Sequence, residues 1–181
     1  MSDSWVLRIE RMEEQVHPRT KRRRTIGRYV VLHDGRRVRG LAGWTAEAKG
    51  PGANAPEGNG LRIEAGVYPL ATWNGERYKT FGYAERAGPN TWPKPGLELR
   101  RTNKRTEILI HPGRNFLSSV GCINLCTELG SAQSPIDPHD SHARVLALIA
   151  DLQEFCARFP AANGRPIPGA VVQVIGEPAA Q

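Results

Sequence analysis

Short runs of alternating apolar and polar residues, separated by turn-forming residues, dominate the pattern along this chain. Such runs predict β-strands that bury one face. An Asp34-Gly35 pair between two of the runs is a strong signal for a tight hairpin turn. The strands predicted in this way cover residues 5–9, 28–33, 37–41, 61–63, 66–72, 78–83, 97–99, 107–110 and 170–175.

One segment has helical periodicity instead. Its apolar residues recur at spacings of three and four, which places them on one face of a helix. These residues are Val145, Ile149, Leu152, Cys156 and Phe159. We expect a helix over about 141–159, ended by Pro160. Residues 49–60 and 87–96 are rich in glycine and proline, so we expect irregular loops there.

Many short strands with one longer C-terminal helix favour a β-rich α+β fold, and we expect a single domain over residues 1–181. The chain of 181 residues is long enough for one compact core, and its 19 glycines and 14 prolines fit many turns. No apolar run approaches the length that crosses a bilayer. The first five residues lack a basic region followed by an apolar stretch, so we expect synthesis in the cytoplasm without a signal peptide.

Basic residues outnumber acidic ones by 25 to 18, which gives a net charge of +7. Six of them fall within residues 19–28, including Lys21-Arg22-Arg23-Arg24. We favour a solvated, mobile loop for this run, because no interleaved aromatic pattern and no DNA-binding motif accompany it. We therefore do not expect nucleic acid as a partner, although it and an anionic cell-wall polymer stay open as alternatives.

The three cysteines, Cys122, Cys126 and Cys156, are too few for a disulfide framework. They fit a reducing compartment, or one reactive thiol beside two structural ones. A separate group of histidine and aspartate residues precedes the predicted helix, and we expect the Asp and Ser residues of this segment to cap the helix rather than the group to bind a metal. This group is Asp137, His139, Asp140 and His142. We expect neither a metal nor a cofactor.

A histidine and a cysteine lie 11 residues apart, in Ile110-His111-Pro112-Gly113 and Gly121-Cys122. A thiol attacks efficiently only as thiolate, and a nearby imidazole is the usual means of generating one. We expect the strand over 107–110 to place His111 at its end, and the following loop to fold back toward Cys122. The alternative is a buried structural thiol, since its neighbours Val120 and Ile123 are apolar.

The segment Ser119-Val120-Gly121-Cys122-Ile123-Asn124, with His111 upstream, resembles the catalytic signature of the L,D-transpeptidases, cysteine enzymes that remodel bacterial peptidoglycan. Two departures matter. Val120 stands where that signature has a histidine, and the gap from His111 to Cys122 is shorter than in most members. The chain more closely resembles a phage- and prophage-associated L,D-transpeptidase-like domain family of unassigned function. The segments that carry this likeness are 65–69, 107–113 and 121–123, within a catalytic core of about 60–130.

The resemblance implies an L,D-transpeptidase-like β-sandwich and cysteine-dependent acyl transfer on peptidoglycan stem peptides. Cys122 would attack a carbonyl of the peptide, and His111 would take the thiol proton. Backbone N–H groups around Gly121 and Cys122 would hold the oxyanion. Ser119 would orient His111 or shape the loop.

Four further residues are candidates for substrate binding: Arg114, Asn124, Trp73 and Tyr83. The planar guanidinium of Arg114 suits a substrate carboxylate, and the alternative is a solvated loop arginine. Asn124 is better suited to fixing the backbone than to touching substrate. Trp73 and Tyr83, with Trp92, would line a groove, although aromatic residues of a small β-domain are often part of the core.

Three kinds of function follow. The first is an enzyme that performs transpeptidation, carboxypeptidase cleavage or amino-acid exchange in the periplasm or cell wall, reached by phage lysis or as a toxin delivered by a contractile (type VI) injection system. Delivery machinery and an immunity protein would then be partners. The second is a non-catalytic wall-binding or phage structural module, which Val120 and the short loop keep open. The third is a nucleic-acid-associated protein that uses the basic run.

Overall fold

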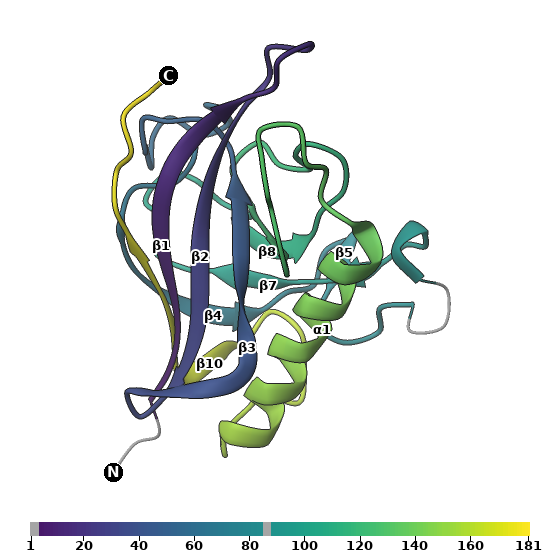
Figure 1. The fold of residues 1–181 in the computed structure, drawn as a ribbon. Coiled ribbons are helices and arrows are strands. Elements are labelled where there is room, and N and C mark those ends of the chain that lie inside the picture. The colour runs from purple at the N-terminus through teal and green to yellow at the C-terminus, as the bar shows by residue number, and fades with distance from the viewer. Residues whose placement is uncertain (1–3, 85–87) are drawn as a thin grey trace.

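The computed structural model, which describes residues 4–84 and 88–181, folds into a strand-rich barrel crossed by one long helix (Figure 1). The order of the eight strands around the closed barrel is β1-β10-β4-β7-β8-β9-β3-β2. Their bounds are β1 Trp5–Val16, β2 Arg23–His33, β3 Arg36–Glu47, β4 Gly66–Thr72, β7 Leu97–Leu99, β8 Leu109–Pro112, β9 Ile123–Cys126 and β10 Pro166–Ile175.

The first three strands form an antiparallel meander, and the Asp34-Gly35 turn between β2 and β3 is confirmed by positive φ angles of 49° and 79°. All three strands are longer than predicted. Their extensions bury several charged residues, alongside apolar ones such as Ile26 and Ala46. Arg11 in β1, for example, forms a fully buried ion pair with Glu47 in β3 at 2.7 Å. Such pairs satisfy buried charges but break the apolar alternation that identifies a strand in sequence.

The remaining strand predictions had mixed outcomes. The strands over 66–72 and 97–99 are confirmed, and the last strand begins four residues earlier than expected, at Pro166. The strand expected at 107–110 begins later, at Leu109. The expected strand at 61–63 is a buried loop segment. Of 78–83 only β5 (Tyr78–Lys79) is strand, in a separate two-stranded sheet with β6 (Lys94–Pro95).

The loop expected at 49–60 is confirmed. The second expected loop, 87–96, contains the short 3₁₀ helix η1 (Gly88–Asn90) and β6, while its first residue lies outside the described residues. Residues 1–3, part of the segment used to judge a signal peptide, also lie outside them.

The predicted helix is present as α1 (Pro138–Phe155), which begins three residues and ends four residues earlier than expected, so that Cys156 and not Pro160 marks its end. Asp137 caps it, and its carboxylate accepts hydrogen bonds from the backbone N–H groups of His139 and Asp140. The expected capping role is therefore confirmed for Asp137, whereas the Asp140 carboxylate accepts hydrogen bonds from Thr127. The apolar stripe of α1 joins the core of the barrel, through Val145, Leu148, Ile149 and Leu152.

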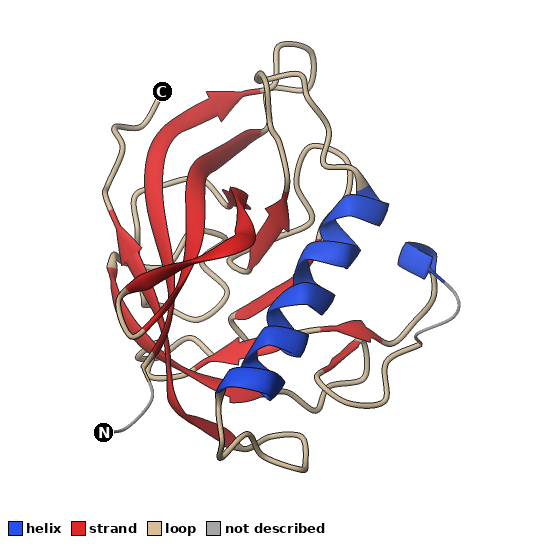
Figure 2. Cartoon of the chain, turned by 60° about the horizontal axis from the view of Figure 1, so that its bottom comes forward, coloured by secondary structure: helices blue, strands red, loops and turns tan. Residues whose placement is uncertain are grey.

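The β-rich α+β class is confirmed, but the expected β-sandwich is not observed, because the main sheet closes on itself (Figure 2). Closure occurs where β1 and β10 pair in parallel, from Trp5 opposite Ala170 to Glu10 opposite Ile175. The alternating pattern of a strand shows which residues face the interior, but not whether the first and last strands meet. Within the described residues, no helix is both long and apolar enough to span a membrane.

The basic run belongs to the β1–β2 hairpin. Its turn carries the exposed Arg19, Lys21 and Arg22, as expected for a solvated loop, whereas the half-buried Arg23 and the buried Arg24 lie in β2. The side chain of Arg24 is fully buried and donates hydrogen bonds to Gln15 and to three backbone carbonyls. Those carbonyls belong to Phe116, Ser131 and Ser134. Arg24 also lies 4.4 Å from the centre of the Phe116 ring. This arginine therefore holds together the segment around Phe116 and the loop that precedes α1.

Candidate active site

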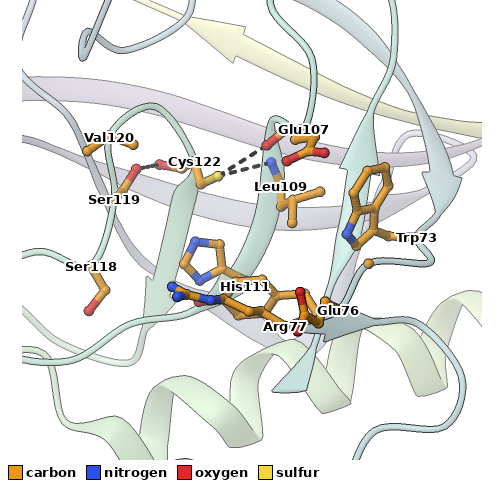
Figure 3. Close-up of a pocket in the computed structure, with 12 residues that line it drawn as sticks. Trp73, Glu76, Arg77, Glu107, Leu109, His111, Ser118, Ser119, Val120 and Cys122 are labelled. Carbon is orange, nitrogen blue, oxygen red and sulfur yellow. Dashed lines mark hydrogen bonds between the residues drawn. The ribbon is translucent and has the colours of Figure 1, made fainter. Parts of the chain in front are cut away.

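Cys122 and His111 meet where β8 and β9 lie side by side. The two strands are parallel, with Ile110 opposite Ile123 and His111 opposite Asn124. Cys122 directly precedes β9, so the alternation of side chains places it on the same face as His111. Both side chains line one cavity of about 520 Å³ (Figure 3). The structure thus brings together the two residues that the sequence singled out.

The thiol of Cys122 sits between two backbone groups of the neighbouring segment. It donates to the carbonyl of Glu107 at 3.5 Å, and the N–H of Leu109 donates to the sulfur at 3.4 Å. Burial raises the pKa of this thiol, and the charge of Glu107 adds to the increase, while the Leu109 N–H and the charge of Arg105 oppose it. A resting thiol that stays protonated is the opposite of the lowered pKa expected for an activated nucleophile. The sequence shows which residues flank Cys122, but it does not show how far folding removes the thiol from water.

His111 is held as a neutral imidazole of one tautomer. Its Nδ1 lies 2.8 Å from the carbonyl oxygen of Pro112. A carbonyl only accepts, so Nδ1 carries the proton and Nε2 keeps its lone pair. Burial lowers the pKa of His111 to about 4, the nearby charge of Lys94 adds to this effect, and the Pro112 carbonyl opposes it. The ring of Tyr78 packs on the imidazole, with centres 4.2 Å apart. Near neutral pH, His111 is therefore in the form that a general base requires.

The turn before Cys122 is shaped by Ser119 and Gly121. The Ser119 hydroxyl donates to the carbonyl of Cys122 at 2.6 Å and accepts from the N–H of Gly121 at 2.9 Å. Of the two roles expected for Ser119, these contacts correspond to the shaping of the loop. They also engage the Gly121 N–H, which was an expected donor to the oxyanion. Gly121 has a φ of +152°, and a side chain there would collide with Arg105.

Asn124 is fully buried and bridges the loop to the histidine strand. Its Oδ1 accepts from the N–H of Ser118 at 3.1 Å, and its Nδ2 donates to the carbonyl of His111 at 3.3 Å. Gly113 packs so closely that an added Cβ would lie 2.6 Å from Asn124 Cγ. Asn124 therefore fixes the backbone, as favoured above, and is too buried to bind a substrate.

The other three residues expected to bind substrate lie at different places relative to the cavity. Trp73 lines the cavity. The half-buried Tyr83 is not among the residues that line this cavity, where we expected it. Arg114 is exposed on its loop, as in the alternative of a solvated arginine, and carboxylate binding by it stays a prediction. The positive charge of Arg114 nevertheless acts on Tyr78. Burial raises the pKa of Tyr78 to about 12, and the charge of Arg114 opposes this rise. Arg114 is thus placed near the edge of the site.

Sequence reasoning missed several residues of the site. Tyr78 stacks on His111, and Glu76 and Arg77 place one negative and one positive charge on the rim beside it. Glu107 has a left-handed φ of 56°, which is uncommon for a residue with a side chain. The pattern around Glu107 resembles an ordinary strand, so the sequence holds no signal for this conformation.

The other two cysteines have structural positions. Cys126 is buried with its sulfur 3.7 Å from the carbonyl of Trp44, and burial raises its thiol pKa to about 12. Cys156 is buried at the end of α1. Among the described residues, no group of three or more histidine, cysteine or acidic side chains is placed to hold a metal ion.

Comparisons of the chain with protein-family models, with curated proteins and with solved structures found no match. Function is therefore inferred from the residues of the cavity and their geometry.

Proposed function

We propose that this protein is a cysteine-dependent acyl transferase or hydrolase that acts on peptide bonds of peptidoglycan stem peptides. One observation carries the proposal. His111 is neutral, its Nδ1 proton is fixed by the Pro112 carbonyl, and its ring lines the same cavity as the Cys122 thiol. A thiol, a base and a group that orients the base form the arrangement that nucleophilic catalysis requires.

The reaction begins with the thiol proton turned from the Glu107 carbonyl toward His111. Nε2 of His111 accepts this proton as Cys122 Sγ forms a bond to the substrate carbonyl carbon. The Leu109 N–H supports the sulfur while negative charge develops on it. Collapse of the tetrahedral intermediate breaks the carbon–nitrogen bond, and the leaving amine takes the proton from His111. The thioester on Cys122 is then resolved by an amine, which gives transpeptidation or exchange, or by water, which gives hydrolysis.

Two observations support a stem peptide as the substrate. The Ser119 to Asn124 segment resembles the L,D-transpeptidase signature, and the rim of the cavity offers both charges and an aromatic surface to a polar peptide. These are Glu76, Arg77 and Trp73. We also propose a relation to the L,D-transpeptidase-like proteins, although the main sheet here is a closed barrel. The site of action would be the periplasm or cell wall, reached by export or by lysis.

The test is intact-mass analysis after incubation with purified muropeptides. We expect an acyl adduct on Cys122 together with shortened or exchanged peptides. Cys122→Ala should give neither, and Cys126→Ala is the matched control that should give both. Unchanged muropeptides with wild-type protein under reducing conditions, from about pH 5 to pH 9, would exclude the enzyme.

A non-catalytic wall-binding or phage structural module is the second candidate. The raised pKa of the Cys122 thiol favours it, because such a thiol is a poor nucleophile unless the base is engaged. So does Val120, which is 79% exposed at the rim, where the family signature has a histidine. This module would bind purified cell walls without forming an acyl adduct.

The nucleic-acid candidate has less support. Arg24 is engaged inside the hairpin, and Arg23 pairs with the buried Glu14. Both are therefore withdrawn from the basic surface on which that candidate depends.

A further inference from the structure

Arg105 is a buried arginine that connects the long loop between β3 and β4 to the turn carrying the nucleophile. It lies between β7 and β8 and is only 4% exposed. Its Nη1 donates to the carbonyls of Ala53 at 3.0 Å and Leu61 at 2.8 Å. Its Nη2 donates to the carbonyl of Val120 at 3.3 Å. The guanidinium thus ties the long loop after β3 to the turn that ends at Cys122.

The contact between Arg105 and this turn is unusually close. A Cβ added to Gly121 would lie 1.9 Å from Nη2 of Arg105, so only glycine leaves room for the guanidinium. The positive charge therefore lies against the peptide that directly precedes Cys122. Two residues further along the chain, Glu107 accepts the thiol hydrogen with its backbone carbonyl, and Glu107 is one of the residues that line the same cavity.

We propose that Arg105 and Glu107 are positioning residues that act in opposition on Cys122: the buried guanidinium favours the sulfur anion and holds its turn, and the carboxylate disfavours that anion. The proposal deepens the proposed function and rests on Cys122 as its nucleophile. The L,D-transpeptidase signature has a histidine at the position of Val120, which is uncharged here. Arg105 instead supplies a cation beside the Gly121-Cys122 pair from another segment of the chain.

The other titratable residues described around the Cys122 sulfur do not replace Arg105 and Glu107 in this role. His111 is neutral near pH 7 because burial lowers its pKa to about 4. Tyr78 is also neutral there, with its pKa raised to about 12 by burial. Glu76 and Arg77 lie on the exposed rim with opposite charges. The charges of Arg105 and Glu107 act on the thiol pKa in opposite directions, as expected for charges in a poorly solvated site.

The experiment measures the ionisation of the thiol and not turnover. The rate of iodoacetamide alkylation at Cys122, followed by mass spectrometry across pH, gives the midpoint for thiolate formation. In Arg105→Gln we expect this midpoint to rise by about one pH unit, so that alkylation below it slows about tenfold. Arg105→Lys keeps the charge and should stay near wild type. Lys104→Gln removes an exposed neighbouring charge and is the matched control, which should leave the midpoint unchanged.

Glu107→Gln should lower the midpoint, by less than Arg105→Gln raises it, because solvent screens an exposed carboxylate. This surface variant should fold, so it tests the opposition of charges even if Arg105→Gln does not fold. Gly121→Ala then tests the role of Arg105. The alanine methyl group competes for the space of Arg105 Nη2, so we expect the midpoint to rise. Wild-type midpoints in folded Arg105→Gln, Glu107→Gln and Gly121→Ala proteins would overturn the proposal. Unchanged muropeptides with shifted midpoints would instead reject the substrate and leave the pair in place.

Discussion

Acid should destabilise this protein through His111, and the size of the effect follows from the structure. The buried imidazole has a pKa of about 4 in the folded protein, against an ordinary value of 6.5. The unfolded chain therefore binds the proton more readily, and stability falls as pH drops from about 6.5 toward 4. At about 1.4 kcal/mol per pH unit, this difference amounts to about 3 kcal/mol lost by pH 4.

The matched variant is His111→Gln, which cannot take up a proton at this position. Urea unfolding of both proteins at a series of pH values gives two stability curves. All other titrating groups, including His142 with its own lowered pKa, contribute to both. We expect the wild-type curve to fall more steeply below about pH 6.5, with a difference that reaches about 3 kcal/mol. Parallel curves would refute the buried, neutral imidazole on which the proposed mechanism depends.

Four further predictions concern the site. Cys122→Ala should reduce muropeptide turnover by at least about a thousandfold with little change in melting temperature; chromatography of the products that showed residual turnover near wild type would contradict the nucleophile. Asn124→Ala should lower the free energy of unfolding by about 3 kcal/mol in urea titrations, because two buried hydrogen bonds are lost; a loss below about 1 kcal/mol would contradict the bridge. Iodoacetamide should alkylate Cys122 more slowly in the native protein than in the urea-unfolded chain near pH 7, because burial raises the thiol pKa; a faster native reaction would count against that environment. Fusion to a cleavable secretory signal should make the protein toxic or alter cell shape in a Cys122-dependent way, whereas toxicity unchanged by Cys122→Ala would point away from the wall.

Local features of the fold and site were predictable because they depend on neighbours in sequence. The hairpin at Asp34-Gly35, the Asp137 cap and the strand over 66–72 belong to this group. The meeting of His111 with Cys122 was also predictable, because a short loop separates a strand end from a Gly-Cys turn.

Features that depend on contacts distant in sequence were not predictable. Arg105 reaches Val120 only through folding of the loop between them, and Arg24 is buried by three loop carbonyls that no pattern near it indicates. The raised pKa of the Cys122 thiol likewise follows from desolvation, which a sequence does not display. Closure of the barrel required the pairing of the two strands that are furthest apart in the chain.

That closing pair determines how the barrel responds to mechanical load. Because β1 and β10 are parallel, Trp5 and Ile175 lie at opposite ends of the seam, and the chain ends emerge at opposite ends of the molecule (Figure 1). Tension between the two ends therefore loads the seam in shear, so that its hydrogen bonds resist together instead of opening one after another. Around the barrel β8 stands four strands away from β1 in either direction. A pull on the ends is thus borne on the wall opposite the strand that carries His111.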